Sequence, residues 1–204
     1  MIYDIFGYSS QILQGADILA TSDKQRSYKV FMPDFLGLDC AQMSWMTLPA
    51  DERMKKMGAL FGGPAEFNKT AKKVLQTMEE LVSKHPEIKS WGFVGYCWGA
   101  KVESLVLSEK GHPFKAGAEC HPAKLDPEDA KKIEIPVAIL ASKDEDMGDV
   151  DSFGKNLKAG TKIEKYEDQI HGWMGARADL EDGHVRDQYL KGYRSLLDWF
   201  HEKL

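Results

Sequence analysis

The segment from Trp91 to Lys101 contains the residues best placed to do chemistry. It reads WGFVGYCWGAK, an apolar run that predicts a short buried strand, followed by a cysteine and the start of a helix. Gly95 and Gly99 stand two positions before and two after Cys97, where a tight strand-to-helix turn brings two backbones close together. Such a turn lifts the central side chain out of the sheet, and the helix N-terminus favours a thiolate. The pattern predicts Cys97 as a nucleophile, with a buried structural cysteine as the alternative.

A nucleophile of this kind needs a base and an acid that orients the base, following it in the order nucleophile, acid, base. An apolar run at 137–141 leads into Ser-Lys-Asp144-Glu-Asp146, and a run ending near Tyr166 leads into His171. The carboxyl ends of parallel strands meet at one edge of a sheet, which is where such folds place their sites. We therefore expect His171 as base and Asp144 as acid. Asp146 stays an alternative, and Asp144 is preferred because it is closer to the strand end.

Two further residues on that edge are open to interpretation. His121 follows a predicted strand directly after Cys120, and it fits either pocket lining or plain structure. A zinc site built from these two residues and neighbouring aspartates lacks the ligand spacing that zinc sites show. We predict that the chain uses no metal and no organic cofactor.

The rest of the chain alternates short β-rich runs with amphipathic helical stretches. This order is typical of an α/β fold, a three-layer α/β/α sandwich with a mostly parallel twisted sheet. We expect strands at 2–6, 28–32, 91–94, 114–119, 137–141 and 162–166, and helices from about 10, 65–84, 100–109, 126–132, 149–158 and 185–202. A chain of 204 residues fits a single domain over 1–204.

Residues 39–63 fit no clean period and are rich in methionine. They are interpreted as a helical connection or as a lid over a pocket, since methionine adapts to irregular surfaces and the pair Gly62-Gly63 can act as a hinge.

Composition narrows the class of protein. Apolar residues make up 43% and charged residues 29%, and the formal net charge is −5, which gives no attraction for nucleic acid or an anionic membrane. No apolar stretch approaches the length of a membrane span. Three cysteines without a disulfide pattern indicate a reducing compartment, and we expect the cytoplasm.

With these residues in hand, the chain resembles the dienelactone hydrolase family, particularly its fungal branch. The resemblance spans nearly the whole length, and its most specific marks are Gly-Tyr-Cys-Trp-Gly at 95–99, Tyr-Asp-Ile-Phe-Gly at 3–7, Cys-His-Pro at 120–122 and His-Gly-Trp-Met-Gly-Ala-Arg at 171–177. It implies an α/β-hydrolase fold and a Cys-His-Asp triad that opens esters or lactones through a thioester, as a carboxymethylenebutenolidase does. It also implies that the backbone amides of Ile5 and Trp98 form the oxyanion hole.

The resemblance extends to residues that would bind substrate. A glutamate that interacts with the resting thiol in bacterial relatives corresponds to Asp4, which is one methylene shorter. Arg177 matches an arginine that holds a substrate carboxylate, a role that suits a guanidinium. The aromatic residues Tyr96, Trp98 and Trp173 suggest an apolar pocket wall.

Family members carry one or two strands before the segment with which this chain opens, so we expect a sheet without the usual first strands. An exposed edge strand is a liability, and we expect reduced stability or a homodimer that covers the edge.

The function that these residues favour is a cysteine-dependent hydrolase of small-molecule esters or lactones. Two alternatives stay open. One is a non-catalytic protein that keeps the fold and uses Cys97 as a redox-sensitive thiol. The other is a thioesterase or acyltransferase within the same fold.

Overall fold

A parallel sheet of four strands is the centre of the computed structural model, which describes residues 1–26 and 28–204. The strands are β1 (Trp91–Tyr96), β2 (Phe114–Cys120), β3 (Val137–Ser142) and β4 (Thr161–Tyr166), and they lie in the order β1-β2-β3-β4. All three pairings are parallel, so each connection crosses over the sheet and every strand ends at the same edge. The strands expected within 91–166 are confirmed to within two residues at each end.

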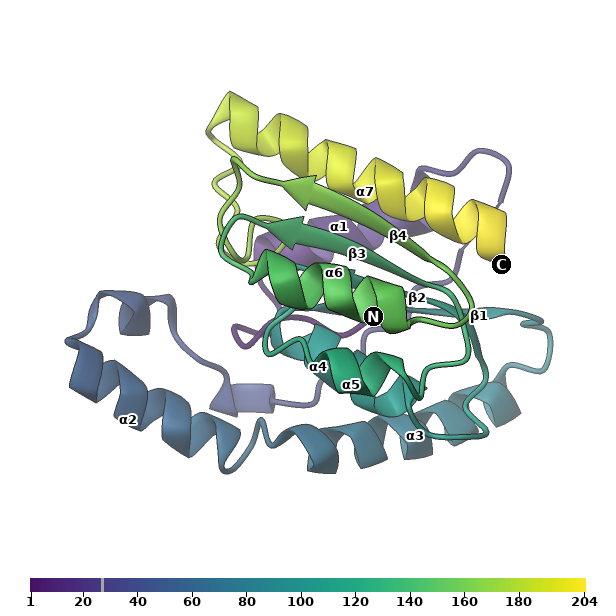
Figure 1. Ribbon diagram of the computed structural model, residues 1–204, viewed down its shortest axis with the longest axis horizontal. Coiled ribbons are helices and arrows are strands. Elements are labelled where there is room, and N and C mark those ends of the chain that lie inside the picture. Colours follow the sequence, from purple (N-terminus) through teal and green to yellow (C-terminus); the bar gives the residue numbers. More distant parts are fainter. Residues whose placement is uncertain (27) are drawn as a thin grey trace.

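Helices cover both faces of this sheet (Figure 1). One layer holds α1 (Ser10–Thr21) and α7 (Gly183–Lys203), which pack against each other. The other holds α3 (Phe67–Lys84), α4 (Trp98–Leu107), α5 (Pro127–Ala130) and α6 (Met147–Asn156). The predicted three-layer α/β/α sandwich is confirmed. Within the described residues, no helix combines the length and apolarity that crossing a bilayer requires.

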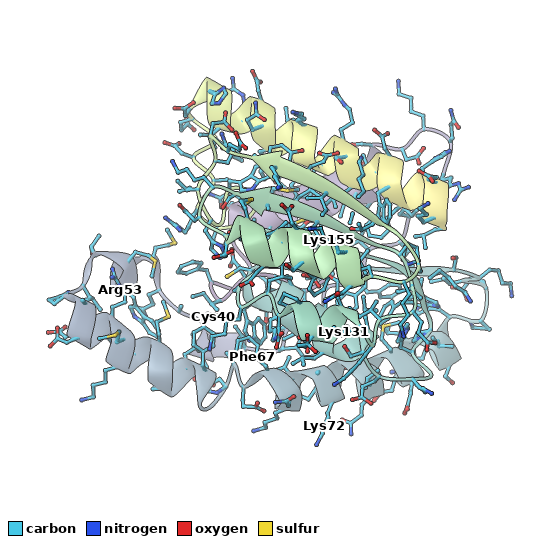
Figure 2. All side chains as sticks on the ribbon, in the orientation of Figure 1. Cys40, Arg53, Phe67, Lys72, Lys131 and Lys155 are labelled. Carbon is cyan, nitrogen blue, oxygen red and sulfur yellow. The ribbon has the colours of Figure 1, made fainter. Side chains whose placement is uncertain are left out.

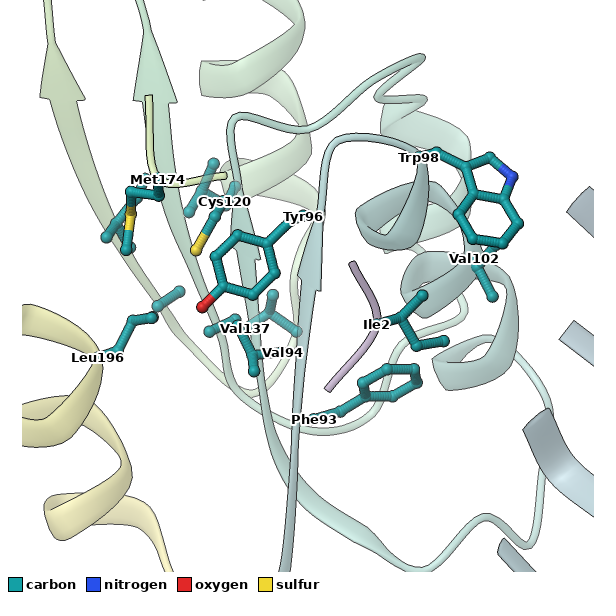
Figure 3. Packing of buried hydrophobic residues seen from close by; sticks show 14 of the residues in the cluster. Ile2, Phe93, Val94, Tyr96, Trp98, Val102, Cys120, Val137, Met174 and Leu196 are labelled. Carbon is teal, nitrogen blue, oxygen red and sulfur yellow. The ribbon is translucent and has the colours of Figure 1, made fainter. Parts of the chain in front are cut away.

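Side chains alternate across β1, as the period of a strand requires. Val94 and Tyr96 point to the face covered by α7, where Leu196 meets them, whereas Phe93 points to the other face, which also holds Ile2 (Figure 3). Both sides are buried, which explains why β1 is apolar along its length. The strand is therefore fixed in register by two packed layers.

The edge beside β1 differs from the prediction. The expected strand at 2–6 is reduced to a single bridge, in which Ile2 accepts from the amide of Tyr96 and donates to the carbonyl of Val94. The expected strand at 28–32 is wrong: its backbone forms no ladder, and the carbonyl of Phe31 accepts from the amino group of Met1. A mostly apolar cavity of about 540 Å³ lies along this edge, and neither Cys97 nor His171 lines it.

Residues 37–63 form a helical segment that projects from the sandwich. It contains two 3-10 helices, η1 (Gly37–Asp39) and η2 (Met43–Thr47), and the helix α2 (Ala50–Phe61). In Figure 1 this segment lies on the side toward which the strand arrows point, beyond the layers that cover the sheet. The two sequence interpretations, a connection and a lid, both fit a helical segment in this place.

The turn between β1 and α4 depends on two glycines. A Cβ atom on Gly95 would lie 2.4 Å from the carbonyl oxygen of Gly99, and one on Gly99 would lie 2.5 Å from the carbonyl oxygen of Ile2. Both obstacles are backbone atoms, which cannot swing away as a flexible side chain can. The glycines at these positions are therefore required by close approach of three segments.

We expect Gly99→Ala to destabilise the protein by about 1–3 kcal/mol, the typical cost of forcing extra volume into a packed interior. Chemical denaturation of the purified variant measures this free energy of unfolding. Gly58→Ala in α2 is the matched control, because a Cβ there meets no atom within 4 Å and the change favours the helix. Equal stability of the two variants would contradict the close approach described here.

Candidate active site

Cys97 lies at the turn between β1 and α4 in a conformation that non-glycine residues rarely adopt. Its φ is 53° and its ψ is −111°. Backbone strain of this kind costs about 1–3 kcal/mol and persists only where the surroundings enforce it. Here the amide of Cys97 donates to the carbonyl of Cys120 at 3.0 Å, and its carbonyl accepts from Ala123 at 3.1 Å and Ala100 at 3.2 Å. The turn thus holds Cys97 at the carboxyl edge of the sheet, as expected.

His171 lies in the loop after β4, and a carboxylate contacts its ring. The distance between Nδ1 of His171 and Oε1 of Glu145 is 2.6 Å. Glu145 itself is fixed, because its carboxylate accepts from the amide of Ser142 and from the Ser142 hydroxyl. Its side chain is 4% exposed, against 25% for His171. The loop after β3 therefore orients the imidazole from its inner side.

The carboxylate that contacts the imidazole is not the one predicted from the sequence. Asp144 accepts from the backbone amide of His171 at 2.8 Å and holds the main chain of the loop, so it is not the carboxylate on the ring. Asp146, the alternative, caps α6 by accepting from the amides of Gly148 and Asp149. Sequence reasoning passed over Glu145. The signal lay in the run of three acids, where a capping role for the third leaves two carboxylates for the histidine loop.

The surroundings of His171 favour its charged form. Burial opposes protonation, but the thiolate charge of Cys97, a hydrogen bond with its sulfur and the carboxylate of Glu145 outweigh burial and raise the pKa of His171 to about 10. The two residues that the sequence predicts as nucleophile and base are therefore neighbours in the structure. A sulfur, an imidazole and a carboxylate form one chain of interacting groups.

Asp4, which corresponds to the family glutamate in the resemblance, binds two backbone amides in the structure. It is 1% exposed, and its two oxygens accept from the amides of Phe6, at 2.9 Å, and Ala176, at 2.8 Å. Burial raises the pKa of Asp4, while these two hydrogen bonds and the nearby charge of His171 partly offset that effect. The carboxylate thus ties the loop after β4 to the N-terminal loop, which leaves it committed to backbone groups.

The two amides expected to form an oxyanion hole are free to bind. Trp98 is the first residue of α4, so its amide has no acceptor within the helix. The amide of Ile5 has no acceptor among the residues described, while its carbonyl accepts from Ala41 at 2.8 Å. Trp98 directly follows Cys97, and Ile5 directly follows Asp4, so donors without an acceptor at these two positions would suit a developing oxyanion.

The aromatic residues expected in a pocket wall are core residues instead. Tyr96, Trp98 and Trp173 are fully buried. Tyr96 follows the alternation of β1 toward α7 and packs near Tyr193, with ring centroids 6.2 Å apart. The indole of Trp98 donates to the carbonyl of Ala65 at 2.9 Å, and Trp173 packs on Tyr166 with ring centroids 4.2 Å apart. Strand alternation and packing, which single residue types do not reveal, decide these positions.

His121 and Arg177 both lie against His171. The ring of His121 is fully buried, stands edge-on to that of His171 with centroids 5.2 Å apart, and finds no hydrogen-bond partner among the residues described. Burial lowers its pKa well below the usual value, so it is neutral. Arg177 is half-buried and donates from Nη1 to the carbonyl of His171 at 2.7 Å. One nitrogen of its guanidinium therefore binds the backbone of the loop.

No set of three or more His, Cys, Asp or Glu side chains gathers as metal ligands within residues 1–26 and 28–204.

The sequence is similar to those of known proteins. The sequence profile described as the dienelactone hydrolase family matches residues 1–204. The chain is 34% and 33% identical to two uncharacterized AIM2 family proteins of Schizosaccharomyces pombe, over 98% and 97% of its length and 80% and 79% of theirs. It is 27% identical to the hydrolase tropI of Talaromyces stipitatus, over 99% of this chain and 80% of that protein.

A solved structure shows the same fold. The dienelactone hydrolase of Anabaena variabilis superposes with a TM-score of 0.66 at 12% identity, covering 100% of this chain and 84% of that one. The fold is that of the α/β-hydrolases, and the chain belongs to the dienelactone hydrolase family.

The shifted titration of His171 can be tested directly. Cys97→Ala removes the thiolate, so we expect the pKa of His171 to fall from about 10 toward its ordinary value near 6.5. The ring resonances of His171, followed by NMR against pH, measure this.

The same shift has a consequence for stability. Because the folded-state pKa lies above the unfolded one, the stabilisation is fully present below about pH 6.5 and disappears as pH rises through about 10. The free energy of unfolding of the native protein should fall more steeply across that window than that of Cys97→Ala. Parallel pH profiles of the two proteins would contradict the coupling.

Proposed function

We propose that this chain hydrolyses carboxylic esters or lactones, with Cys97 as nucleophile, His171 as general base and acid, and Glu145 as the residue that orients His171. The observation that carries the proposal is the 2.6 Å contact between Nδ1 of His171 and the carboxylate of Glu145, on a ring whose pKa the Cys97 sulfur also raises. Membership of the dienelactone hydrolase family supports the class of reaction. The ester class and the cytoplasmic setting are parts of this proposal.

The first half of the reaction forms a thioester. His171 already holds the proton of the Cys97 thiol, and the thiolate sulfur attacks the carbonyl carbon of the substrate, so that a carbon–sulfur bond forms. The amides of Ile5 and Trp98 donate to the oxygen that becomes negative. The carbon–oxygen bond to the alcohol then breaks, and His171 gives its proton to the leaving oxygen.

The second half releases the acid. His171 takes a proton from a water molecule, whose oxygen attacks the thioester carbon. The carbon–sulfur bond breaks, and the proton returns to the sulfur. Glu145 accepts from Nδ1 throughout and keeps Nε2 directed at the sulfur and the water, which is the part that the carboxylate plays in a catalytic triad.

Replacing either reacting group should abolish turnover. We expect Cys97→Ala and His171→Ala each to lower kcat/KM for a short aryl ester by at least about 10³-fold, because both act on the bonds that change. Release of the chromophore measures this, and circular dichroism checks the fold. Turnover that survives both changes would refute the mechanism. Labelling of Cys97 by iodoacetamide without any turnover would favour the redox-thiol alternative, and transfer to an added alcohol or thiol would favour an acyltransferase.

The two neighbouring acids give a matched pair of variants. We expect Glu145→Gln to lower kcat about 10²- to 10⁴-fold, since an amide in place of the carboxylate can hold the imidazole in the wrong tautomer. Asp144→Asn should lower kcat less than about tenfold, because the amide oxygen still accepts from the backbone of His171. Steady-state kinetics at several pH values measure both. A large loss in Asp144→Asn with near-normal Glu145→Gln would return the role to Asp144.

A further inference from the structure

Residues 42–64, which we call the arm, fold mainly on themselves. The arm contains η2 and α2, and of the 12 residues of α2 only Leu60 is buried. Arg53 of α2 donates from Nη1 to the carbonyl of Met46 at 3.1 Å, and Nζ of Lys56 lies 5.0 Å from the ring centroid of Trp45. A helix this short is marginal in water by itself. The rest of the protein therefore leaves most of the arm exposed.

The two ends of the arm are attached to the residues whose amides would hold the oxyanion. Before the arm, the amide of Ala41 donates to the carbonyl of Ile5 at 2.8 Å. After it, the carbonyl of Ala65 accepts from the indole of Trp98 at 2.9 Å. Figure 2 shows Cys40 and Phe67 where the arm meets the body, and Arg53 far out along it. The arm therefore starts and ends at the candidate site.

A second contact lies at the base of the arm, where the arm joins the rest of the protein near the candidate site. Phe61 stacks on Phe67, with ring centroids 5.4 Å apart, and Nζ of Lys124 lies 5.6 Å and 5.5 Å from these two rings. Lys124 directly follows Ala123, whose amide donates to the carbonyl of Cys97. The aromatic base of the arm is thus one short loop away from the nucleophile.

The arm presents apolar side chains that nothing in the described chain covers. Met54 is 68% exposed and Met43 48% exposed. Met54, Met57 and Phe61 follow helical spacing and share one face of α2, which is exposed at Met54 and half-buried at Met57 and Phe61. This apolar face leads from open solvent toward the base of the arm. Methionine side chains adapt to ligands of irregular shape.

We propose that the arm binds the apolar substituent of the substrate, so that the preferred esters or lactones carry an extended hydrocarbon chain. The inference rests on the proposed function, and it names the substrate class that the site would take. Three observations favour a hydrocarbon chain: exposed thioethers on the arm, a continuous apolar face on α2, and attachment at both ends to the oxyanion residues. In this proposal, the hydrocarbon chain of an acyl group bound to Cys97 extends along this face.

The test compares chain lengths in matched variants. In the double variant Met43→Ser/Met54→Ser, the ratio of kcat/KM for p-nitrophenyl octanoate to that for the acetate should fall at least about tenfold, because only the long chain reaches the arm. Val82→Ser is the control, since Val82 is 39% exposed on α3, outside the arm. It should leave the ratio unchanged. Both serine variants replace exposed side chains, so folding is expected to be preserved.

The outcomes separate this inference from the proposed function. An unchanged ratio, with acetate hydrolysis still lost in Cys97→Ala, overturns the role of the arm and leaves the hydrolase standing. If no ester is turned over, the rates at which N-octylmaleimide and N-methylmaleimide label Cys97 give the same comparison without catalysis. A double variant that changes from dimer to monomer with an unchanged ratio would make the arm a contact between two copies and overturn the proposal.

Discussion

The strained backbone of Cys97 is the constraint on which the rest of the site depends. A φ of 53° places the sulfur beyond the end of β1 while α4 starts at the next residue. The conformation is possible because Gly95 and Gly99 let the strand, the helix and the Ile2 segment approach within the space that a Cβ would occupy. Hydrogen bonds from the β2 loop to both backbone groups of Cys97 then hold it there. Packing of three segments thus supplies the energy that keeps Cys97 in this conformation at the end of the sheet.

Three carboxylates contact the loop of His171. Two of them accept from backbone amides, and the third contacts the imidazole. Asp4 joins the N-terminal loop to the loop of His171, and Asp144 holds the backbone of His171 itself. With the main chain fixed by these two, Glu145 is left to orient the ring. Different acids therefore hold the backbone of the loop and contact the imidazole. This arrangement also explains why a run of three acids follows β3, because the third caps α6.

Much of this could be predicted from the sequence, for definite physical reasons. Glycines two positions on either side of Cys97 impose one kind of turn, and alternation of strands and helices imposes parallel strands that end at one edge, so Cys97 and His171 had to approach. The predictions that were wrong concerned the direction in which a side chain points, which the residue type does not reveal. Tyr96 is buried because its place in the alternation of β1 faces α7, and the ring of His171 meets Glu145 because the turn after β3 directs Asp144 at the backbone. The expected strand at 28–32 failed because pairing depends on a neighbour that a local pattern does not specify.

The proposed mechanism requires Cys97 to carry the acyl group of an ester between the two halves of the reaction. The most direct test is intact-protein mass spectrometry, with peptide mapping, after rapid acid quenching of the protein mixed with an excess of p-nitrophenyl ester. We expect a mass increase equal to one acyl group, located on the peptide that contains Cys97 and lost on treatment with neutral hydroxylamine. Release of p-nitrophenol with the acyl group on another residue, or with no acylated species at any quench time, would contradict it.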